Sequence, residues 1–199
     1  MRPRRYGDAG QAFPIYITVV GGLLFLAFAY FAVGQAAVNR NGAQTAADAA
    51  ALAAAQETRK QLADEWVTDV LDPTKWQGIF NGGGVDFEGC AQADQLAAQN
   101  DADVLRCTPN PFLLRYEVEV RTRKPMGESI VPITATQKSK APAAAVIEPL
   151  CTFKLPADGA GADVLPQLTC KDNKTWDLDP EDLTDLPGPE DLFDVHLAD

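Results

Sequence analysis

PIYITVVGGLLFLAFAYFAV, residues 14–33, is an apolar run without a charge, and the alanine-rich run AQTAADAAALAAA, residues 43–55, follows it closely. About 20 apolar residues in a helix match the hydrocarbon core of a bilayer, which is about 30 Å thick. Residues 13–37 are therefore predicted to form a transmembrane helix. Alanine has the highest intrinsic helix propensity, so we expect the helix to continue over residues 38–65 outside the bilayer. The polar segment 39–42 allows a kink at the membrane surface.

The charges that flank the apolar run predict its orientation. Arg2, Arg4 and Arg5 precede the run, whereas Arg40 is the one nearby cation after it. Positive residues concentrate on the cytoplasmic side of a membrane. We therefore expect a single-pass protein of the cell membrane, with a cytoplasmic N-terminus and the bulk of the chain extracellular. A cleaved signal ending at residues 32–34 is the alternative, but signals have apolar cores of about 7–15 residues, which favours a retained anchor.

The four cysteines agree with an extracellular location. Cys90, Cys107, Cys151 and Cys170 all follow the apolar run, and four cysteines allow three pairings. Order along the chain favours Cys90–Cys107 and Cys151–Cys170, each closing a loop that stabilises by about 3 kcal/mol. A metal site is disfavoured because the chain has no CxxC motif and its lone His196 lies far from the cysteines in sequence.

Composition divides the rest of the chain into three parts. Residues 1–12 form a basic head, residues 66–150 carry mixed globular signals, and residues 151–199 become rich in Pro, Asp and Gly. Acids dominate from Lys171 onward, so we expect this disulfide-containing tail to be flexible, extended or disordered. The predicted fold class is α+β, pilin-like, with the long helix packed on a small antiparallel sheet.

The domain over residues 66–150 contains recognisable strand patterns. Leu114–Thr122 alternates apolar and charged side chains, which is typical of a strand with one solvated face. A second strand is predicted over Ser129–Gln137, with Pro132 favouring an edge position. We also expect a short helix over Asp94–Ala102 and a strand over residues 104–107. A sheet of two or three strands is not stable alone in water. The long helix or a disulfide must therefore cover one face of the sheet.

No pattern in the chain indicates catalysis or a cofactor. The serine-hydrolase elbow, the zinc HExxH motif and the phosphate loop are all missing from the sequence. Residues 177–188 contain several acids, but Asp182 and Gly188 stand where a calcium loop needs glycine and glutamate. The formal net charge of -11 disfavours nucleic acid. We therefore predict a protein that is not an enzyme and binds no cofactor, metal or nucleic acid.

Four segments carry a family resemblance. A basic head is followed by Gly10-Gln11-Ala12-Phe13, a single span and QTAADAAALA at residues 44–53. This combination resembles the TadE/TadG-like proteins of Flp (tight-adherence) pilus systems, in their actinobacterial form. AAQNDADVLRC at residues 97–107 and YEVEV at residues 116–120 resemble a helix–Cys–strand section of the same proteins. The likeness covers roughly residues 7 to 140.

The resemblance implies a non-catalytic role in assembling a pilus or a related surface secretion apparatus. The implied partners are an inner-membrane platform, pilin-like subunits and membrane lipid. It also implies cleavage by a prepilin peptidase between Gly10 and Gln11. Such pilins often carry a glutamate five residues into the mature chain, whereas this chain has Ile15. The departure favours a permanent membrane accessory over a subunit of the filament shaft.

The alanine run also predicts a packing face. Ala43, Ala47, Ala51 and Ala55 lie four residues apart, a spacing that lets two backbones approach closely. The face is expected to meet the chain's own domain or a partner, including a second copy, unless the ladder is a by-product of alanine content. A different class of function stays open alongside pilus assembly, namely a membrane-anchored surface binding module whose helix is a stalk.

Overall fold

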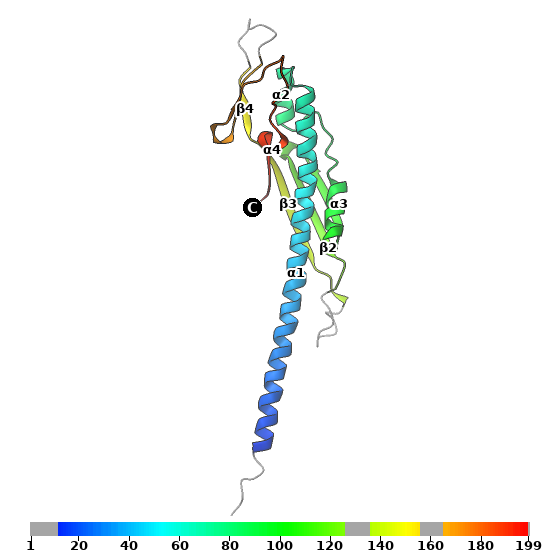
Figure 1. Ribbon diagram of the computed structural model, residues 1–199. Coiled ribbons are helices and arrows are strands. Elements are labelled where there is room, and N and C mark those ends of the chain that lie inside the picture. The colour runs from blue at the N-terminus through cyan, green and yellow to red at the C-terminus, as the bar shows by residue number, and fades with distance from the viewer. Residues whose placement is uncertain (1–11, 126–135, 156–164, 199) are drawn as a thin grey trace, which may run out of the picture.

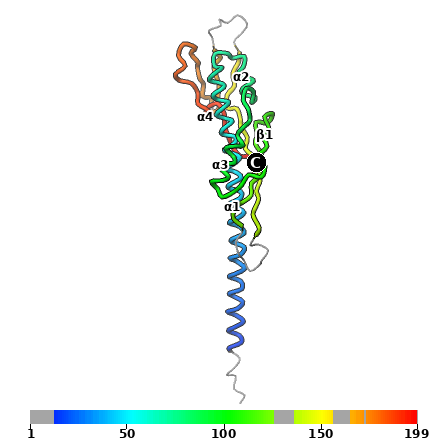
Figure 2. Tube along the Cα trace, turned by 90° about the vertical axis from the view of Figure 1, so that its right-hand side faces the viewer, coloured from blue at the N-terminus to red at the C-terminus, as the bar shows by residue number. Residues whose placement is uncertain are grey.

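One long helix organises the whole molecule. The computed structural model describes residues 12–125, 136–155 and 165–198. Helix α1, Ala12–Thr68, has 57 residues and continues without a break through the polar segment 39–42. The rest of the chain forms a head along the C-terminal part of α1, so the molecule is elongated in both views (Figures 1 and 2).

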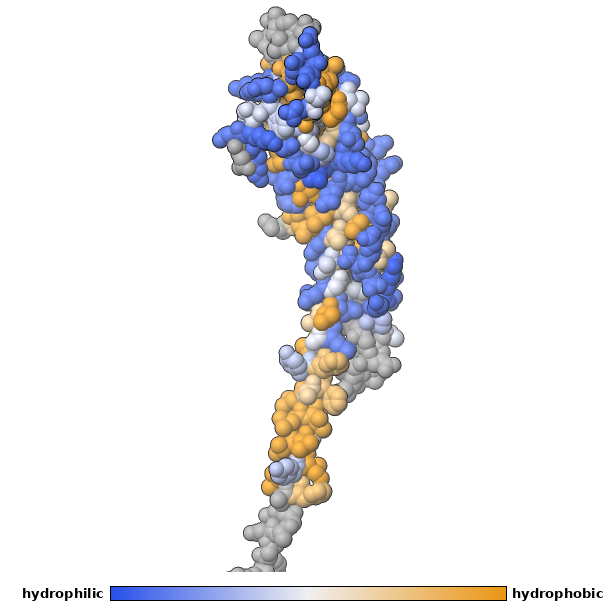
Figure 3. Space-filling model, in the orientation of Figure 1, coloured by the Kyte–Doolittle hydropathy of each residue, from blue (hydrophilic) through white to orange (hydrophobic). Residues whose placement is uncertain are grey.

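The N-terminal part of α1 is bare and apolar. It contains a segment with a mean hydropathy of 2.2 that is long and apolar enough to cross a membrane, and none of that segment is buried. Phe13 is 74 % exposed at its start and Val38 is 71 % exposed at its end. Figure 3 shows this part as a hydrophobic column below a mostly hydrophilic head. Apolar surface of this extent marks a membrane or protein contact, as the predicted transmembrane helix requires.

A four-stranded antiparallel sheet forms the centre of the head. Its strands lie in the order β1-β2-β3-β7, where β1 is Ala102–Asn110, β2 is Arg115–Thr122, β3 is Lys140–Pro149 and β7 is Phe193–Leu197. The alternation predicted for β2 is present, because Tyr116, Val118 and Val120 are buried while the charged residues between them are not. Helix α1 packs on the face that carries these buried side chains.

Smaller elements surround the sheet. Helix α3, Cys90–Gln99, packs against α1 and β1, and helix α2, Pro73–Phe80, begins after Asp72, whose carboxylate accepts a hydrogen bond from the backbone N–H of Thr74. Asp at the N-cap and proline at the first helical position are both favourable. The remaining elements are β4 (Cys151–Phe153), β5 (Leu168–Cys170) and β6 (Thr175–Trp176), which form a second sheet, the short helix α4 (Pro189–Leu192), and 3₁₀ turns at Pro111–Leu113 and Lys171–Asn173.

The core of the head is a stripe along α1. Small side chains come first, and larger ones follow toward the C-terminal end of the helix. The fully or almost fully buried members are Ala43, Ala46, Ala47, Ala50, Ala51, Ala54, Ala55, Thr58, Leu62, Ala63 and Trp66. The alanine-rich segment is therefore the core of the head and not a bare stalk. Trp66 and Trp76 are both fully buried.

The strand predicted over Ser129–Gln137 lies largely outside the described residues. The described strand that follows β2 and pairs with it is β3, Lys140–Pro149. Its sequence KAPAAAVIEP is rich in alanine, which has low strand propensity. Small side chains at Ala141 and Ala145, both buried, allow α1 to lie close to this strand, so tertiary packing outweighs local preference.

The prediction of a flexible or disordered tail is wrong for its described part. Beyond residue 165, the chain forms β5, β6, α4 and β7, and β7 completes the main sheet by pairing with β3. Leu192 and Phe193 are fully buried. Acidic composition alone does not predict this folded tail, because a few apolar residues at spaced positions are enough to pack an otherwise charged segment onto the head.

Candidate interaction surfaces

The predicted alanine face is fully occupied within the chain. Ala43, Ala47, Ala51 and Ala55 are each 0 % exposed, and their helix contacts α3 and strands β2, β3 and β7. None of these four side chains is accessible to a second molecule while the head stays folded. Helix-mediated self-association through these four residues is therefore blocked in the folded head.

A buried hydrogen-bond network locks α3 and the sheet to α1. The Tyr116 hydroxyl lies 2.7 Å from the Thr58 hydroxyl on α1 and accepts a hydrogen bond from the Gly89 backbone N–H at 3.1 Å. Burial raises the pKa of the Tyr116 phenol, so it stays protonated and available as a donor. Any side chain at residue 89 would clash with the Ala54 carbonyl and lie 2.8 Å from the Ala54 Cα. Glycine is required there because the backbones touch, a requirement that the sequence did not reveal.

Two disulfides fasten the head at separate places. Cys90–Cys107 ties the start of α3 to β1, and Cys151–Cys170 ties β4 to β5. These are the pairs that order along the chain favours. All four cysteines are thereby used, so none offers a thiol for catalysis or metal binding.

An aromatic cluster joins the second sheet to the main core. Trp76 packs against Trp66 with ring centroids 5.4 Å apart and against Phe153 at 5.2 Å, while Phe80 lies 5.4 Å from Phe193. Aromatic pairs in this range add to the free energy of area burial. The cluster explains how elements far apart in sequence form one head.

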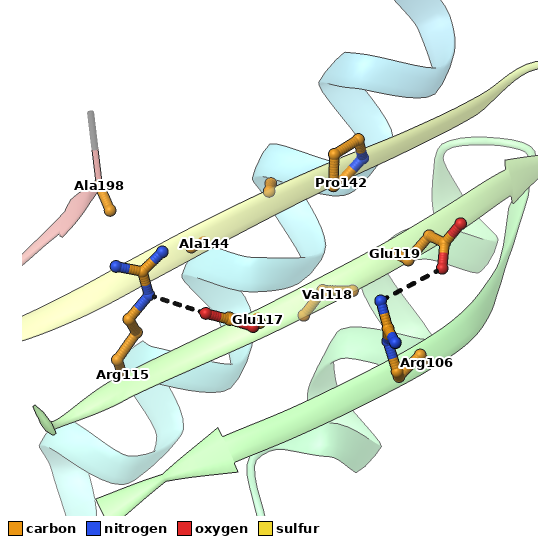
Figure 4. A pocket seen from close by; sticks show the side chains of 9 residues that line it. Arg106, Arg115, Glu117, Val118, Glu119, Pro142, Ala144 and Ala198 are labelled. Atoms are coloured by element: carbon orange, nitrogen blue, oxygen red, sulfur yellow. Dashed lines mark ion pairs between the residues drawn. The ribbon is translucent and has the colours of Figure 1, made fainter. Parts of the chain in front are cut away.

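The uncovered face of the main sheet carries a shallow charged cleft of about 310 Å³. Arg106 and Glu119 form an ion pair at 3.6 Å across β1 and β2, and Arg115 and Glu117 form another at 3.4 Å along β2 (Figure 4). The lining residues are Arg106, Arg115, Glu117, Val118, Glu119, Pro142, Ala143, Ala144 and Ala198. In Figure 4, α1 lies behind the sheet, so these charged side chains face away from it.

Small residues give this surface its shape. On β3, Pro142 and Ala144 contribute little height, whereas the neighbouring strand β2 contributes long charged side chains. The side chain of Glu117 is 64 % exposed. Ion pairs of this exposure contribute little to stability, about 0–1 kcal/mol each. Their charges are therefore available to a partner without loss of the fold.

His196 lies on a strand and not in a loose end, which corrects the expectation from its position near the C-terminus. It pairs with Val146 across β3 and β7, and its Nδ1 lies 3.3 Å from Asp194 Oδ2. Glu148 is close enough that the three side chains offer donor atoms within 4.8 Å of one another. His196 and Asp194 are 46 % and 44 % exposed, so the group is an open surface cluster with no enclosed cavity.

The predicted peptidase site, Gly10 and Gln11, lies outside the described residues. Ile15, at the position of the glutamate found in many pilins, is 62 % exposed on the apolar part of α1.

Comparison with known proteins confirms the resemblance for the N-terminal segment. Residues 10–57 match the Tad family model, described as "Putative Flp pilus-assembly TadE/G-like". This segment comprises most of α1, including the apolar part and most of the buried alanine stripe. No curated protein and no solved structure matches the chain.

Proposed function

We propose that this protein is a non-catalytic, pilin-like membrane component of a Flp/Tad-type pilus or a related secretion apparatus. The single observation that carries the proposal is the shared use of α1. One uninterrupted helix provides the apolar segment that can span a membrane and the buried stripe on which the head folds. The family match covers both uses of that helix.

The proposed topology follows from charge. Arginines before the apolar segment support a cytoplasmic N-terminus and a head on the outer side. Two disulfides in the head support this orientation, because such bonds persist in oxidising compartments. Ile15 supports a permanent accessory, because it lacks the charge that would pair with a neighbouring subunit's N-terminus.

The uncovered sheet face is the proposed contact with another pilus protein, either a platform component or a pilin-like subunit. It is the side of the sheet opposite α1, and its paired charges can exchange partners across an interface. Electrostatic complementarity of this kind contributes specificity more than affinity. The partner is expected to present alternating charges of its own.

Site-specific crosslinking in the native host tests this proposal. A photoreactive amino acid at Ala144, in the cleft, should crosslink the full-length protein to a pilus or secretion protein identified by mass spectrometry. The same group at the exposed Lys171, on the 3₁₀ turn after β5, is the matched control and should give no such product. Crosslinking from Lys171 but not from Ala144, or no product from either site, would contradict the proposed contact.

A further inference from the structure

The head begins only a few residues after the bare apolar part of α1 ends. Val38 is the last large apolar side chain exposed on the bare part of α1, and Ala43 is already fully buried in the head. Five residues of helix rise about 8 Å. The polar headgroup layer on each side of a bilayer is about 5–7 Å thick. A hydrocarbon core that ends at Val38 would therefore bring the lower end of the head within or directly onto this layer.

The turn after β2 overhangs the last part of the apolar segment. Asn39 of α1 donates its side-chain N–H to the backbone oxygens of Lys124 at 3.2 Å and Pro125 at 3.4 Å. Thr122 Oγ1 donates to the same Lys124 oxygen at 3.0 Å. These bonds hold residues 124–125 beside the helix, independently of any lipid.

Between this turn and α1 lies a cleft of about 490 Å³. Apolar side chains from the exposed part of α1 line it, together with Lys124, whose ammonium pairs with Asp101. The lining residues are Tyr30, Phe31, Gly34, Gln35, Val38, Asn39, Lys124 and Pro125. Among the described residues, no atom outside Gly34's own stretch of helix lies within 4 Å of the place where Gly34 would carry a Cβ, so this glycine leaves room in the cleft.

Cations gather at this end of an otherwise acidic protein. Arg123 and Lys124 pair with Asp103 and Asp101 at 2.7 and 2.9 Å. The further cations at the same end are Arg40, Arg121, Lys138 and Lys140. Among the residues that the structure describes, none of these four has an acidic partner within 4.0 Å. The chain as a whole carries a net charge of -11, so this local excess of cations runs against its composition.

We propose that the membrane-proximal end of the head is a seat for an anionic phospholipid of the adjacent leaflet. The glycerol and upper acyl chain occupy the cleft beside Gly34, and the phosphate meets the surrounding cations. Continuity with the exposed apolar helix supplies the acyl environment, and charge complementarity selects the headgroup. The seat does not depend on a role in pilus assembly, so either proposal can fail without the other.

The test uses the full chain, with its disulfides intact, in phosphatidylcholine nanodiscs that contain a minor fraction of phosphatidylglycerol. Electron paramagnetic resonance of acyl-spin-labelled phosphatidylglycerol and phosphatidylcholine measures which lipid the protein immobilises. The wild-type protein should prefer phosphatidylglycerol, and added salt should weaken the preference because it screens exposed charges. Equal immobilisation of the two lipids by the wild-type protein would overturn the proposal.

Paired variants distinguish binding at the membrane-proximal end of the head from a general effect of the protein's total charge. Lys138→Gln/Lys140→Gln removes two exposed cations and should reduce the preference by about fivefold for each charge at low salt. Lys154→Gln/Lys171→Gln removes two exposed cations from the far end and should leave it unchanged. An equal loss in both double variants would show a general charge effect and overturn the seat.

A second pair of variants tests the cleft itself. Gly34→Leu fills the space beside Tyr30 and should reduce immobilisation of phosphatidylglycerol without changing the charge. Gly21→Leu adds the same side chain to the span, also into open space, and should have no effect. Unchanged immobilisation in Gly34→Leu would refute the cleft as the binding place.

Discussion

The junction of Tyr116, Thr58 and Gly89 gives the most quantitative test of how the head is attached to its helix. Tyr116→Phe removes one hydroxyl and leaves the ring in place. The Gly89 N–H then loses its acceptor in a buried site, and the Thr58 hydroxyl loses its partner. A buried polar group without a partner costs about 1–3 kcal/mol. We expect Tyr116→Phe to reduce the free energy of unfolding by about 2–4 kcal/mol in total.

The partner variant makes the magnitude testable. Thr58→Val removes the hydroxyl on α1 but leaves Tyr116 to accept from Gly89, so it should cost about 1 kcal/mol. In the double variant no Thr58 hydroxyl is left unpaired. Its cost should therefore be smaller than the sum of the two single costs by about 1 kcal/mol, the coupling that a double-mutant cycle measures.

The assay is guanidinium unfolding of the full chain in nanodiscs, followed by the fluorescence of Trp66 and Trp76, which are both buried in the head. Far-ultraviolet circular dichroism of the unfolded baseline controls for the span, which stays helical in lipid. Additive costs within about 0.5 kcal/mol would mean that the two hydroxyls do not interact. A Tyr116→Phe cost near zero would refute the claim that this network fastens the head to α1.

Three further predictions concern other parts of the head. Ala50→Leu should destabilise the head by about 1–3 kcal/mol through overpacking against the sheet, measured by the same unfolding curve. Replacing Cys151 and Cys170 by serine should cost about 3 kcal/mol and expose the second sheet to limited proteolysis before the main sheet. The hydrogen bond from Lys174 lowers the pKa of Asp191 below its ordinary value of 3.8, so this pair stabilises the head above that pH and loses its effect as the pH falls below it. Lys174→Gln should therefore narrow the difference in stability between pH 7 and pH 3, as followed by thermal unfolding.

Strong local periodicity made part of the fold predictable. The alternation over Leu114–Thr122 predicted β2 and its solvated face correctly, because the side chains on each face differ sharply in polarity. The apolar run, which contains no charge, also predicted the exposed part of α1. The small-residue spacing predicted a packing face but did not say whether the head or a partner would cover it.

The elements that could not be predicted depend on contacts distant in sequence. Strand β3 is rich in alanine, which has low strand propensity, and it is a strand because β2 and β7 pair with it on either side. Phe193 is buried by Phe80 and its neighbours, which no local pattern reveals. The cleft beside Gly34 arises only because Asn39 holds a turn from residues about 85 positions away in sequence.

Shared use of α1 also restricts how the head meets a partner. A flexible linker would let the head turn and tilt freely above the membrane. Here the helix passes from exposed Val38 to buried Ala43 without a break, and a helix of this kind resists both twisting and bending. The open sheet face is therefore held at a set height and direction relative to the span. Under the proposed contact, a membrane-anchored partner would meet Arg115 and Glu117 at that fixed height, whereas a freely diffusing ligand gains nothing from it.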